Sequence, residues 1–407
     1  MSSLNKKKII NDPIYGFITI EHEIVFDCIQ LPEFQRLRRI KQLGLTSLVY
    51  PGAQHTRFQH VIGAMHLMQT AVTSLRSKEV TISEDEEIGV LLAILLHDIG
   101  HGPFSHSLEH GILTDVSHEY ISSILMERIN AKMDGKLNLA IQIFENKYPR
   151  KFLHQLVSSQ LDMDRLDYLR RDSFYTGVSE GTVGIERIIQ MLNVKDDCLI
   201  VEQKGIFSVE KFLMARRFMY WQVYLHKTSI AADRMMLNIL KRAKEIISEG
   251  KTLFASPYLY FFLSRNFTQA DLQKPDVLEN FCNLDDSEVI SAIKVWQNSE
   301  DVTLSTLCKM LINRNLLKIE IAESPFDSAT IEKRRTAVCD QIGIPKEQAD
   351  YFVITGKLSN NTYSTQGDTL KIGMKDGSLK ELSETSEIYN LSDDNKPTIK
   401  YFITSIK

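Results

Sequence analysis

A group of histidines and acids follows an apolar, helix-like run between residues 91 and 106. The stretch LLAILLHDIGHGPFSH places His97 and Asp98 directly after the apolar residues, and His101 and His106 follow within eight positions. Imidazole and carboxylate groups beside an apolar core are costly to bury unless a partner compensates them. A metal ion is one such partner, and the glycines after the pair would end the helix so that both side chains could face one ion.

Two further residues extend this pair to a possible ligand set. His60 lies in HTRFQHVIG on an expected helix, three residues after Arg57, and Asp164 lies in the helical stretch SSQLDMDRLDYLRRD. Two imidazoles and two carboxylates suit Mn, Fe, Zn, Ni or Mg, with positions left for a reactive water. The spacing alone leaves other interpretations open. An HD dipeptide occurs by chance in many proteins, Asp164 could be a solvated helix residue, and His60 could be a core histidine bonded to a carbonyl.

The composition is that of a globular protein without a polyanion-binding character. The chain has 407 residues, 43% hydrophobic and 25% charged, which allows one large domain with additions or two domains. Its formal net charge of −4 requires any phosphate site to be local. The five cysteines form no CxxC pair, and the chain shows neither a signal sequence nor an apolar run of the roughly 20 residues that span a membrane. We therefore expect a cytoplasmic protein.

The elements that must position these residues are expected to be mainly helical. From residue 31 to about 250 apolar residues recur at spacings of three and four, and SEDEEIGVLLAILLHDIG opens with a capping-box pattern of Ser83 and Glu86. We expect a strand or turn region over 1–30, a hairpin over 194–205 and further helices over 251–315. Strands are expected in LLKIEIA, DYFVITGKL, TLKIGM and KYFITSI, and a helix in SATIEKRRTAVCDQIG. The sequence predicts a mainly α core over 1–315 and a small α+β C-terminal lobe over 316–407.

The order of the motifs resembles the HD-domain phosphohydrolase superfamily. The shared stretches are KKKIINDPIYG, PEFQRLRRIKQLG, YPGAQHTRFQHVIG, LLHDIGHGPFSH, DMDRLDYLRRD and VYLHK, over residues 6 to about 230. Within it the chain is most similar to the dNTP triphosphohydrolases, namely the bacterial dGTPase-like enzymes and the animal sterile-alpha-motif/HD-domain enzyme. The resemblance implies a helical HD fold and hydrolysis of a dNTP to a deoxynucleoside and tripolyphosphate, in which a metal-activated water attacks the α-phosphorus. It implies metal ligands at His60, His97, Asp98 and Asp164.

The resemblance also implies catalytic residues around the metal. Histidines matching His101, His106 and His118 line the α-phosphate in the family, and an acid matching Glu109 orients one of them. We expect His106 to lie closest to the leaving oxygen, because that oxygen must be protonated. His101 and His118 are then expected to activate water and stabilise charge, although these two roles could be exchanged. Capping or core histidines are the alternative interpretation.

The expected substrate contacts also follow from the resemblance. Arg57 suits the α-phosphate, Asp172 would accept a hydrogen bond from the sugar 3′-OH, and Tyr224 would pack on the sugar at C2′ and reject a ribose. The stretch RRFMYWQVYLHK is expected on one long helix; without the family it would be a core aromatic stripe with a basic edge. The full expected set is Gln42, Arg57, Arg165, Tyr168, Asp172, Arg216, Tyr224, His226 and Lys227.

A basic stretch, QRLRRIK, has two interpretations. It could be a solvated helix face, or it could contribute, as in relatives, to an activating-nucleotide site between subunits. The residues concerned would be Lys8, Arg36 and Arg38. Gln30 stands where the guanine-dependent relatives have an acid, and an amide cannot accept from both N1–H and N2–H of guanine. Strict activation by GTP or dGTP is therefore not expected.

Three functions stay open at this point. The leading one is a metal-dependent dNTP triphosphohydrolase that forms a homo-oligomer, a dimer or tetramer. The second is another HD phosphohydrolase, either a nucleoside monophosphate phosphatase or a cyclic-nucleotide phosphodiesterase. The third is a nucleotide or nucleic-acid binding protein with little turnover. Nucleic acid binding is not expected, because the net charge is −4 and no basic groove with stacking aromatics is evident.

Overall fold

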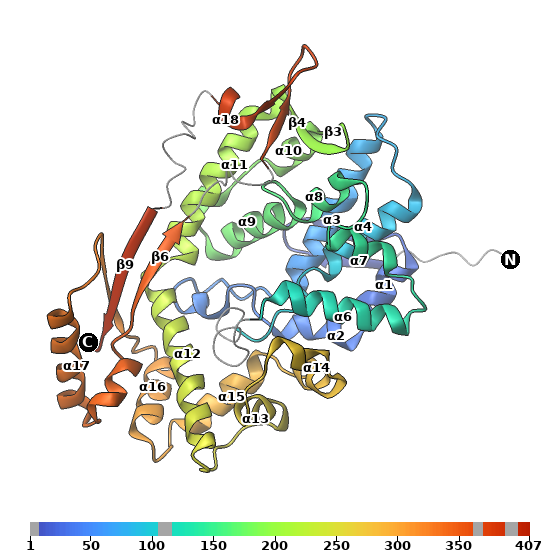
Figure 1. Ribbon diagram of the computed structural model, residues 1–407. Helices are drawn as coiled ribbons and strands as arrows, with labels where there is room; N and C mark the ends of the chain where they lie inside the picture. Colours follow the sequence, from blue (N-terminus) through green and yellow to red (C-terminus); the bar gives the residue numbers. More distant parts are fainter. Residues whose placement is uncertain (1–7, 105–115, 361–368, 387–397) are drawn as a thin grey trace.

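The computed structural model describes residues 8–104, 116–360, 369–386 and 398–407 (Figure 1). Helices form the body of the molecule and short strands lie at its edges, so the mainly α expectation with a C-terminal α+β lobe is confirmed. Within the described ranges, no helix is both long enough and apolar enough to cross a membrane.

The N-terminal segment is a hairpin followed by a helix. Strands β1 (Lys8–Asp12) and β2 (Gly16–Ile20) are antiparallel, and Asp12 closes the turn because its Oδ1 accepts the N–H groups of Ile14 and Tyr15 at 2.9 and 3.1 Å. The expected strand or turn region to residue 30 is wrong in its second half. Helix α1 (Glu23–Gln30) forms there, because Val25, Cys28 and Ile29 bury one face at helical spacing.

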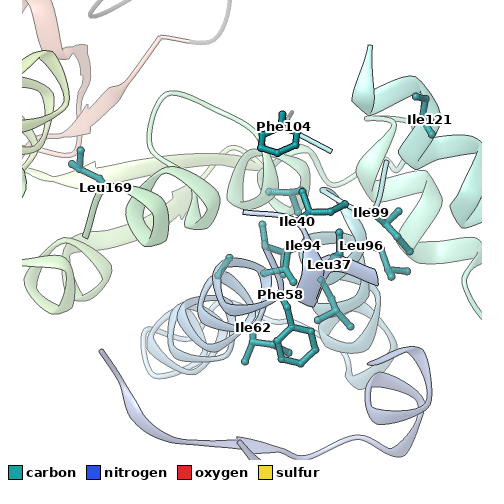
Figure 2. Packing of buried hydrophobic residues seen from close by; sticks show 14 of the residues in the cluster. Leu37, Ile40, Phe58, Ile62, Ile94, Leu96, Ile99, Phe104, Ile121 and Leu169 are labelled. Carbon is teal, nitrogen blue, oxygen red and sulfur yellow. The ribbon is translucent and has the colours of Figure 1, made fainter. Parts of the chain in front are cut away.

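Three helices form the centre of the core. Helix α3 (Arg57–Arg76) packs against both α4 (Glu84–Leu96) and α9 (Met163–Thr176). Figure 2 shows Phe58 and Ile62 of α3 near Ile94 and Leu96 of α4. The predicted capping box is confirmed, since Ser83 Oγ accepts the Glu86 N–H at 3.2 Å and Glu86 Oε2 accepts the Ser83 N–H at 2.9 Å. These helices bring the candidate ligands together.

A glycine allows α3 and α9 to approach closely. A Cβ atom added at Gly63 would lie 2.1 Å from Asp167 Oδ1 and 2.2 Å from Arg171 Nη2, so no larger residue fits. The other elements before residue 316 surround this centre. Their bounds are α2 (Pro32–Gln35), the 3-10 helices Arg36–Arg39, Gly44–Leu48, Ser179–Gly181, Gln203–Gly205 and Gln269–Gln273, α6 (His118–Lys132), α7 (Asn138–Phe144), α8 (Lys151–Val157), α10 (Ile185–Met191), α11 (Ile206–Met219), α12 (Lys227–Ser248), α13 (Pro257–Leu263), α14 (Pro275–Cys282), α15 (Asp286–Trp296) and α16 (Val302–Ile312).

The expected long helix over the stretch RRFMYWQVYLHK is wrong, because the chain breaks between α11 and α12. A π-helical turn covers Tyr220–Tyr224, and the Leu225 N–H donates to the Tyr220 carbonyl at 2.7 Å. His226 has extended backbone angles and caps α12, its Nδ1 accepting the Thr228 N–H at 3.2 Å. The break needs no proline or glycine, since packing of the aromatic rings and the histidine cap stabilise it.

The C-terminal segment returns to the helical body in two places. Strands β5 (Lys318–Ala322), β9 (Thr398–Ser405) and β6 (Thr355–Asn360) form one sheet, in that order. Strands β7 (Lys371–Gly373) and β8 (Leu379–Glu381) extend the predicted hairpin of β3 (Leu192–Lys195) and β4 (Cys198–Glu202). Helix α17 (Ser328–Ile342), a 3-10 helix (Lys346–Tyr351) and α18 (Leu382–Thr385) complete the segment. The division into domains at residue 315 stays a prediction.

Candidate active site

The four predicted metal ligands lie together at the centre of the core. His60 comes from the first turn of α3, His97 and Asp98 from the end of α4, and Asp164 from the first turn of α9. His60 Nε2 lies 3.0 Å from Asp164 Oδ1 and 3.9 Å from Asp98 Oδ2. His97 Nε2 lies 3.3 Å from Asp98 Oδ1 and 3.5 Å from Asp164 Oδ1. The arrangement brings two imidazole nitrogens and two carboxylates into one cluster.

Acceptors on the far side of each ring fix the orientation of both imidazoles. His60 Nδ1 donates to Asp167 Oδ2 at 2.8 Å, and His97 Nδ1 donates to the Ile94 carbonyl at 2.6 Å. Because each Nδ1 carries the proton, each Nε2 can present a lone pair to the site. Both Nε2 atoms face the carboxylate of Asp164, at 3.0 and 3.5 Å from its Oδ1. Ligand atoms of His60, His97 and Asp164 lie within 4.8 Å of one another and could therefore hold a divalent metal ion. By the same spacing Asp98 groups with His101 and His118, next to the first three.

The charges of the site favour ionised carboxylates. Burial raises the pKa of Asp98, but the charges of His97 and Arg57 outweigh it and hold that pKa well below its usual range. Burial likewise raises the pKa of Asp164, and hydrogen bonds from His60 and His97 reverse that effect. The pKa of His60 is lowered by burial, yet its hydrogen bonds to acidic side chains raise it to about 10. Protons and a metal ion would thus compete for the same nitrogen.

Two predicted catalytic histidines lie beside Asp98. His101 Nε2 is 3.3 Å from Asp98 Oδ1, and the His101 ring stacks on the His118 ring with centroids 3.8 Å apart. Burial, followed by the charge of Arg57, lowers the pKa of His101 to about 3, so its imidazole is neutral near pH 7. Arg57 also forms a buried ion pair with Asp98. The other two predicted catalytic residues lie outside the described part of the chain: His106 and Glu109.

A cavity of about 590 Å³ opens next to this cluster. Tyr168 connects the two, since its ring centroid is 6.5 Å from that of His60. Also in the wall, Asp172 Oδ2 accepts a hydrogen bond from the Tyr224 hydroxyl at 2.6 Å, and Asp172 Oδ1 lies 2.8 Å from His55 Nε2. The predicted substrate residues that line the cavity are Gln42, Arg57, Tyr168, Asp172 and Tyr224.

The other predicted substrate residues lie outside the lining of this cavity. Arg165 forms an ion pair with Asp162, the N-cap residue of α9. Arg216 Nη1 lies 3.4 Å from Gln160 Oε1. The structure therefore divides the predicted set of nine into a group of five around the cavity and a remaining group: Arg165, Arg216, His226 and Lys227.

Sequence reasoning missed a buried ionic network behind the site. Arg171 is 0% exposed, and its Nε donates to Asp167 Oδ2 at 2.9 Å while its Nη1 donates to Asp12 Oδ2 at 2.8 Å. This network ties the β1–β2 hairpin to the carboxylate that orients His60. Asp167 lies three residues after Asp164 in the same motif, which is the signal that could have indicated it. Sequence reasoning also missed Arg234 and Lys357, which line the cavity, because neither residue lies in a recognisable motif.

The residues expected at a regulatory nucleotide site differ in exposure. Lys8 places its ammonium 4.9 Å from the ring centroid of Phe26. Arg38 is exposed, and its guanidinium lies 3.5 Å from the ring centroid of Phe58. Arg36 is 0% exposed and donates to backbone carbonyls. The expected nucleotide contact of Arg36 is corrected accordingly, because its charged group lies in the core.

Comparisons with known proteins agree with this geometry. The family described as HD domain matches residues 57–172, and the HD associated region matches residues 183–255. The chain is 32% identical to the uncharacterized protein YwfO of Bacillus subtilis, over 95% of this chain and 89% of that protein. It is 30% identical to the deoxynucleoside triphosphate triphosphohydrolase SAMHD1 homolog of Dictyostelium discoideum, over 78% of this chain and 60% of that protein. A solved phosphohydrolase from Bacteroides thetaiotaomicron has 53% identity and a TM-score of 0.96, covering 99% of this chain and 100% of that one.

Proposed function

The chain belongs to the HD-domain phosphohydrolase family, and from this premise we propose that it hydrolyses deoxynucleoside triphosphates to a deoxynucleoside and tripolyphosphate. The observation that carries the proposal is the position of the cavity. Its wall includes Arg57, which contacts the candidate metal ligand Asp98, and also the hydrogen-bonded pair of Asp172 and Tyr224. A nucleotide with its α-phosphate at the ligands would have its sugar at that pair. The SAMHD1 homolog of Dictyostelium supports the choice of substrate by its name.

The proposed metal ligands are His60, His97, Asp98 and Asp164, and the ion is Mn, Fe, Zn, Ni or Mg. When bound, such an ion would neutralise charge on the phosphate and lower the pKa of water. The protein residues have separate tasks around it. Arg57, whose guanidinium already lies against a carboxylate in the site, would hold an α-phosphate oxygen with paired N–H donors.

The histidines beside the ligands would move protons. His101 is neutral near pH 7, since burial lowers its pKa to about 3, so its unprotonated ring nitrogen can accept a hydrogen bond from water but carries no proton to donate to the leaving group. His118 stacks on His101 with a centroid distance of 3.8 Å. Because two positive rings at this distance would repel each other, the stacking favours a neutral His101. The proposal keeps His106 as the donor to the leaving 5′-oxygen and Glu109 as the acid that orients a histidine.

The sugar contacts explain a preference for deoxynucleotides. Asp172 would accept the single hydrogen of the 3′-OH. Gln42 also lines the cavity, and its side-chain N–H group can donate to the 3′-oxygen. Tyr224 is fixed by its hydrogen bond to Asp172, and we propose that its ring fills the space that a 2′-OH would need. Tyr168 completes the wall on the metal side.

The remaining basic residues are proposed partners of the β- and γ-phosphates. Arg165 and Arg216 contact Asp162 and Gln160, and they would exchange these contacts for phosphate oxygens. Lys227, at the first position of α12, would act in the same way. His226 would support them indirectly, because its ring nitrogen caps that helix.

Product analysis tests the proposal. Purified protein with Mn²⁺ is incubated with each dNTP and each NTP, with and without a second nucleotide, and the products are separated by chromatography. Deoxynucleoside plus tripolyphosphate is the expected result. Orthophosphate or pyrophosphate would instead indicate another HD phosphohydrolase, such as a monophosphate phosphatase or a cyclic-nucleotide phosphodiesterase. Activation by the second nucleotide, together with the mass in solution, would test the expected activator and homo-oligomer.

A further inference from the structure

The cavity lining includes residues that the proposed reaction does not use. Because a helix rises about 1.5 Å per residue, Asp172 lies about 12 Å from Asp164 along the axis of α9. Helix α12 and strand β6 contribute the unused residues to the wall. The lining residues there are Ile230, Asp233, Arg234 and Leu237 from α12, and Lys357, Leu358 and Ser359 from β6.

Aromatic rings of β9 hold the two cations of this wall. The Arg234 guanidinium is 5.9 Å from the Phe402 ring centroid, and the Lys357 ammonium is 5.7 Å from that of Tyr401. A Cβ atom at Gly356, the neighbour of Lys357, would lie 2.6 Å from the Phe402 ring, so the sheet needs glycine there. Phe402 is 1% exposed in a small apolar cluster that joins α12 to the sheet. The wall is therefore a packed structure, and Figure 1 shows β6 and β9 on the same side of the molecule as α12.

We propose that Arg234 and Lys357 contact the base of the bound nucleotide and favour guanine over adenine; this inference rests on the proposed function. Both side chains offer only hydrogen-bond donors. Guanine presents two acceptors, O6 and N7, on one edge, whereas adenine presents a donor amino group beside N7. The same donors favour the O4 of thymine over the amino group of cytosine.

The surroundings favour a base over a polyphosphate beside α12 and β6. Ile230, Leu237 and Leu358 give the wall apolar surface that suits the faces of a base. In the proposed binding mode the sugar lies at Asp172 and Tyr224, and the base would extend from it along the part of the wall that contains none of the candidate metal ligands.

The experiment compares kcat/KM for dGTP, dATP, dTTP and dCTP in full-length protein with Mn²⁺. Wild type is expected to favour dGTP over dATP and dTTP over dCTP, and Arg234→Met and Lys357→Met are each expected to reduce these ratios by about tenfold. Methionine keeps the apolar stem, and Lys357 is exposed, so folding is not at risk in that variant. Lys241→Met is the matched control. Lys241 also lies on α12 and places its ammonium 5.6 Å from an aromatic ring centroid, that of Tyr351, but it is outside the cavity lining. Its ratios are expected to equal those of wild type.

Three results would overturn the inference. Wild type without base preference would do so, as would variants whose ratios are unchanged. An equal fall for all four substrates would place the cations on the phosphates. Absence of dNTP hydrolysis by wild type is a separate outcome, which would overturn the proposed function and, with it, this inference.

Discussion

At the scale of single residues, the candidate metal centre depends on groups that contact no ion. Asp167 and the Ile94 carbonyl accept from Nδ1 of His60 and His97 and so direct both Nε2 atoms to the site. Metal ligands of this kind lose about 10–100-fold in affinity when their supporting group is removed. The candidate ligands were proposed from the order of motifs and lie in one cluster, whereas Asp167 was missed, because its role depends on the close approach of α3 and α9 at Gly63.

Removal of Asp164 should abolish metal binding and preserve the fold. In Asp164→Ala we expect metal affinity to fall by more than about 100-fold, beyond the effect of a supporting group, and hydrolysis to be lost with it. The buried imidazoles of His60 and His97 remain paired through Nδ1, so thermal unfolding stays cooperative. Metal content by elemental analysis and melting by circular dichroism measure both effects. Glu180→Ala, which removes an exposed carboxylate, is the control. Wild-type metal content in Asp164→Ala would remove Asp164 from the ligand set.

At the scale of elements, two buried side chains hold the loop that follows α4. Arg36 donates to the carbonyls of Ile99 and His101 at 2.8 and 2.9 Å. Asp286, the first residue of α15, accepts the N–H groups of Lys41 and Phe104, both at 3.0 Å. The position of His101 beside the site is therefore set by distant parts of the chain. Spacing within the motif could not predict these contacts, because they join residues far apart in sequence.

Replacement of Arg36 should affect stability and His101 together. In Arg36→Lys, the single ammonium cannot reach two carbonyls with the geometry of a planar guanidinium. One buried carbonyl is then unsatisfied, and we expect the free energy of unfolding to fall by about 1–3 kcal/mol. Urea denaturation measures this loss, and kcat should fall more than KM rises. Arg38→Lys, on the exposed face, should change stability by less than about 1 kcal/mol. Equal effects of the two substitutions would contradict a special role for Arg36.

Asp286 should make stability depend on pH. Burial raises the pKa of Asp286 to about 6, although two backbone N–H groups favour the ionised form. Between about pH 4 and 6 the folded protein thus binds more protons than the unfolded chain, so this carboxyl's contribution to unfolding free energy falls as pH rises. The stability of Asp286→Asn relative to wild type should rise by about 2 kcal/mol from pH 4.5 to 6.5 and then stay constant. Denaturation curves at these pH values measure the difference. A difference that is independent of pH would show that Asp286 has an ordinary pKa.

Local patterns predicted most helices and strands, but they failed where packing decides the backbone. The capping box of Ser83 and Glu86 starts α4 as expected, because its two hydrogen bonds lie within one turn. The break between α11 and α12 was missed, since no proline or glycine marks it. It depends on Tyr224, which reaches Asp172 on another helix, and on His226, which caps α12. Contacts between elements explain this error.

At the scale of the whole molecule, the C-terminal segment completes both the core and the cavity. Strand β7 pairs in parallel with β4, and β6 contributes Lys357 to the cavity wall. Sequence patterns predicted the strands of this segment but not their partners, because pairing between distant strands leaves little local signal. The role of the segment therefore became evident only from the three-dimensional arrangement.

A fragment that ends at residue 315 is expected not to fold cooperatively. Phe352, Ile372 and Ile403 are each 0% exposed and belong to the same core cluster as the helices around the site. Burying each contributes about 1.5–3 kcal/mol, so losing these three alone removes an amount comparable with the roughly 5–15 kcal/mol that stabilises a whole domain. Calorimetry of the 1–315 fragment should show no sharp transition, and adding the 316–407 fragment in trans should restore one. A sharp transition of the first fragment alone, within about 5 °C of that of the full chain, would instead establish residues 1–315 as an independent domain.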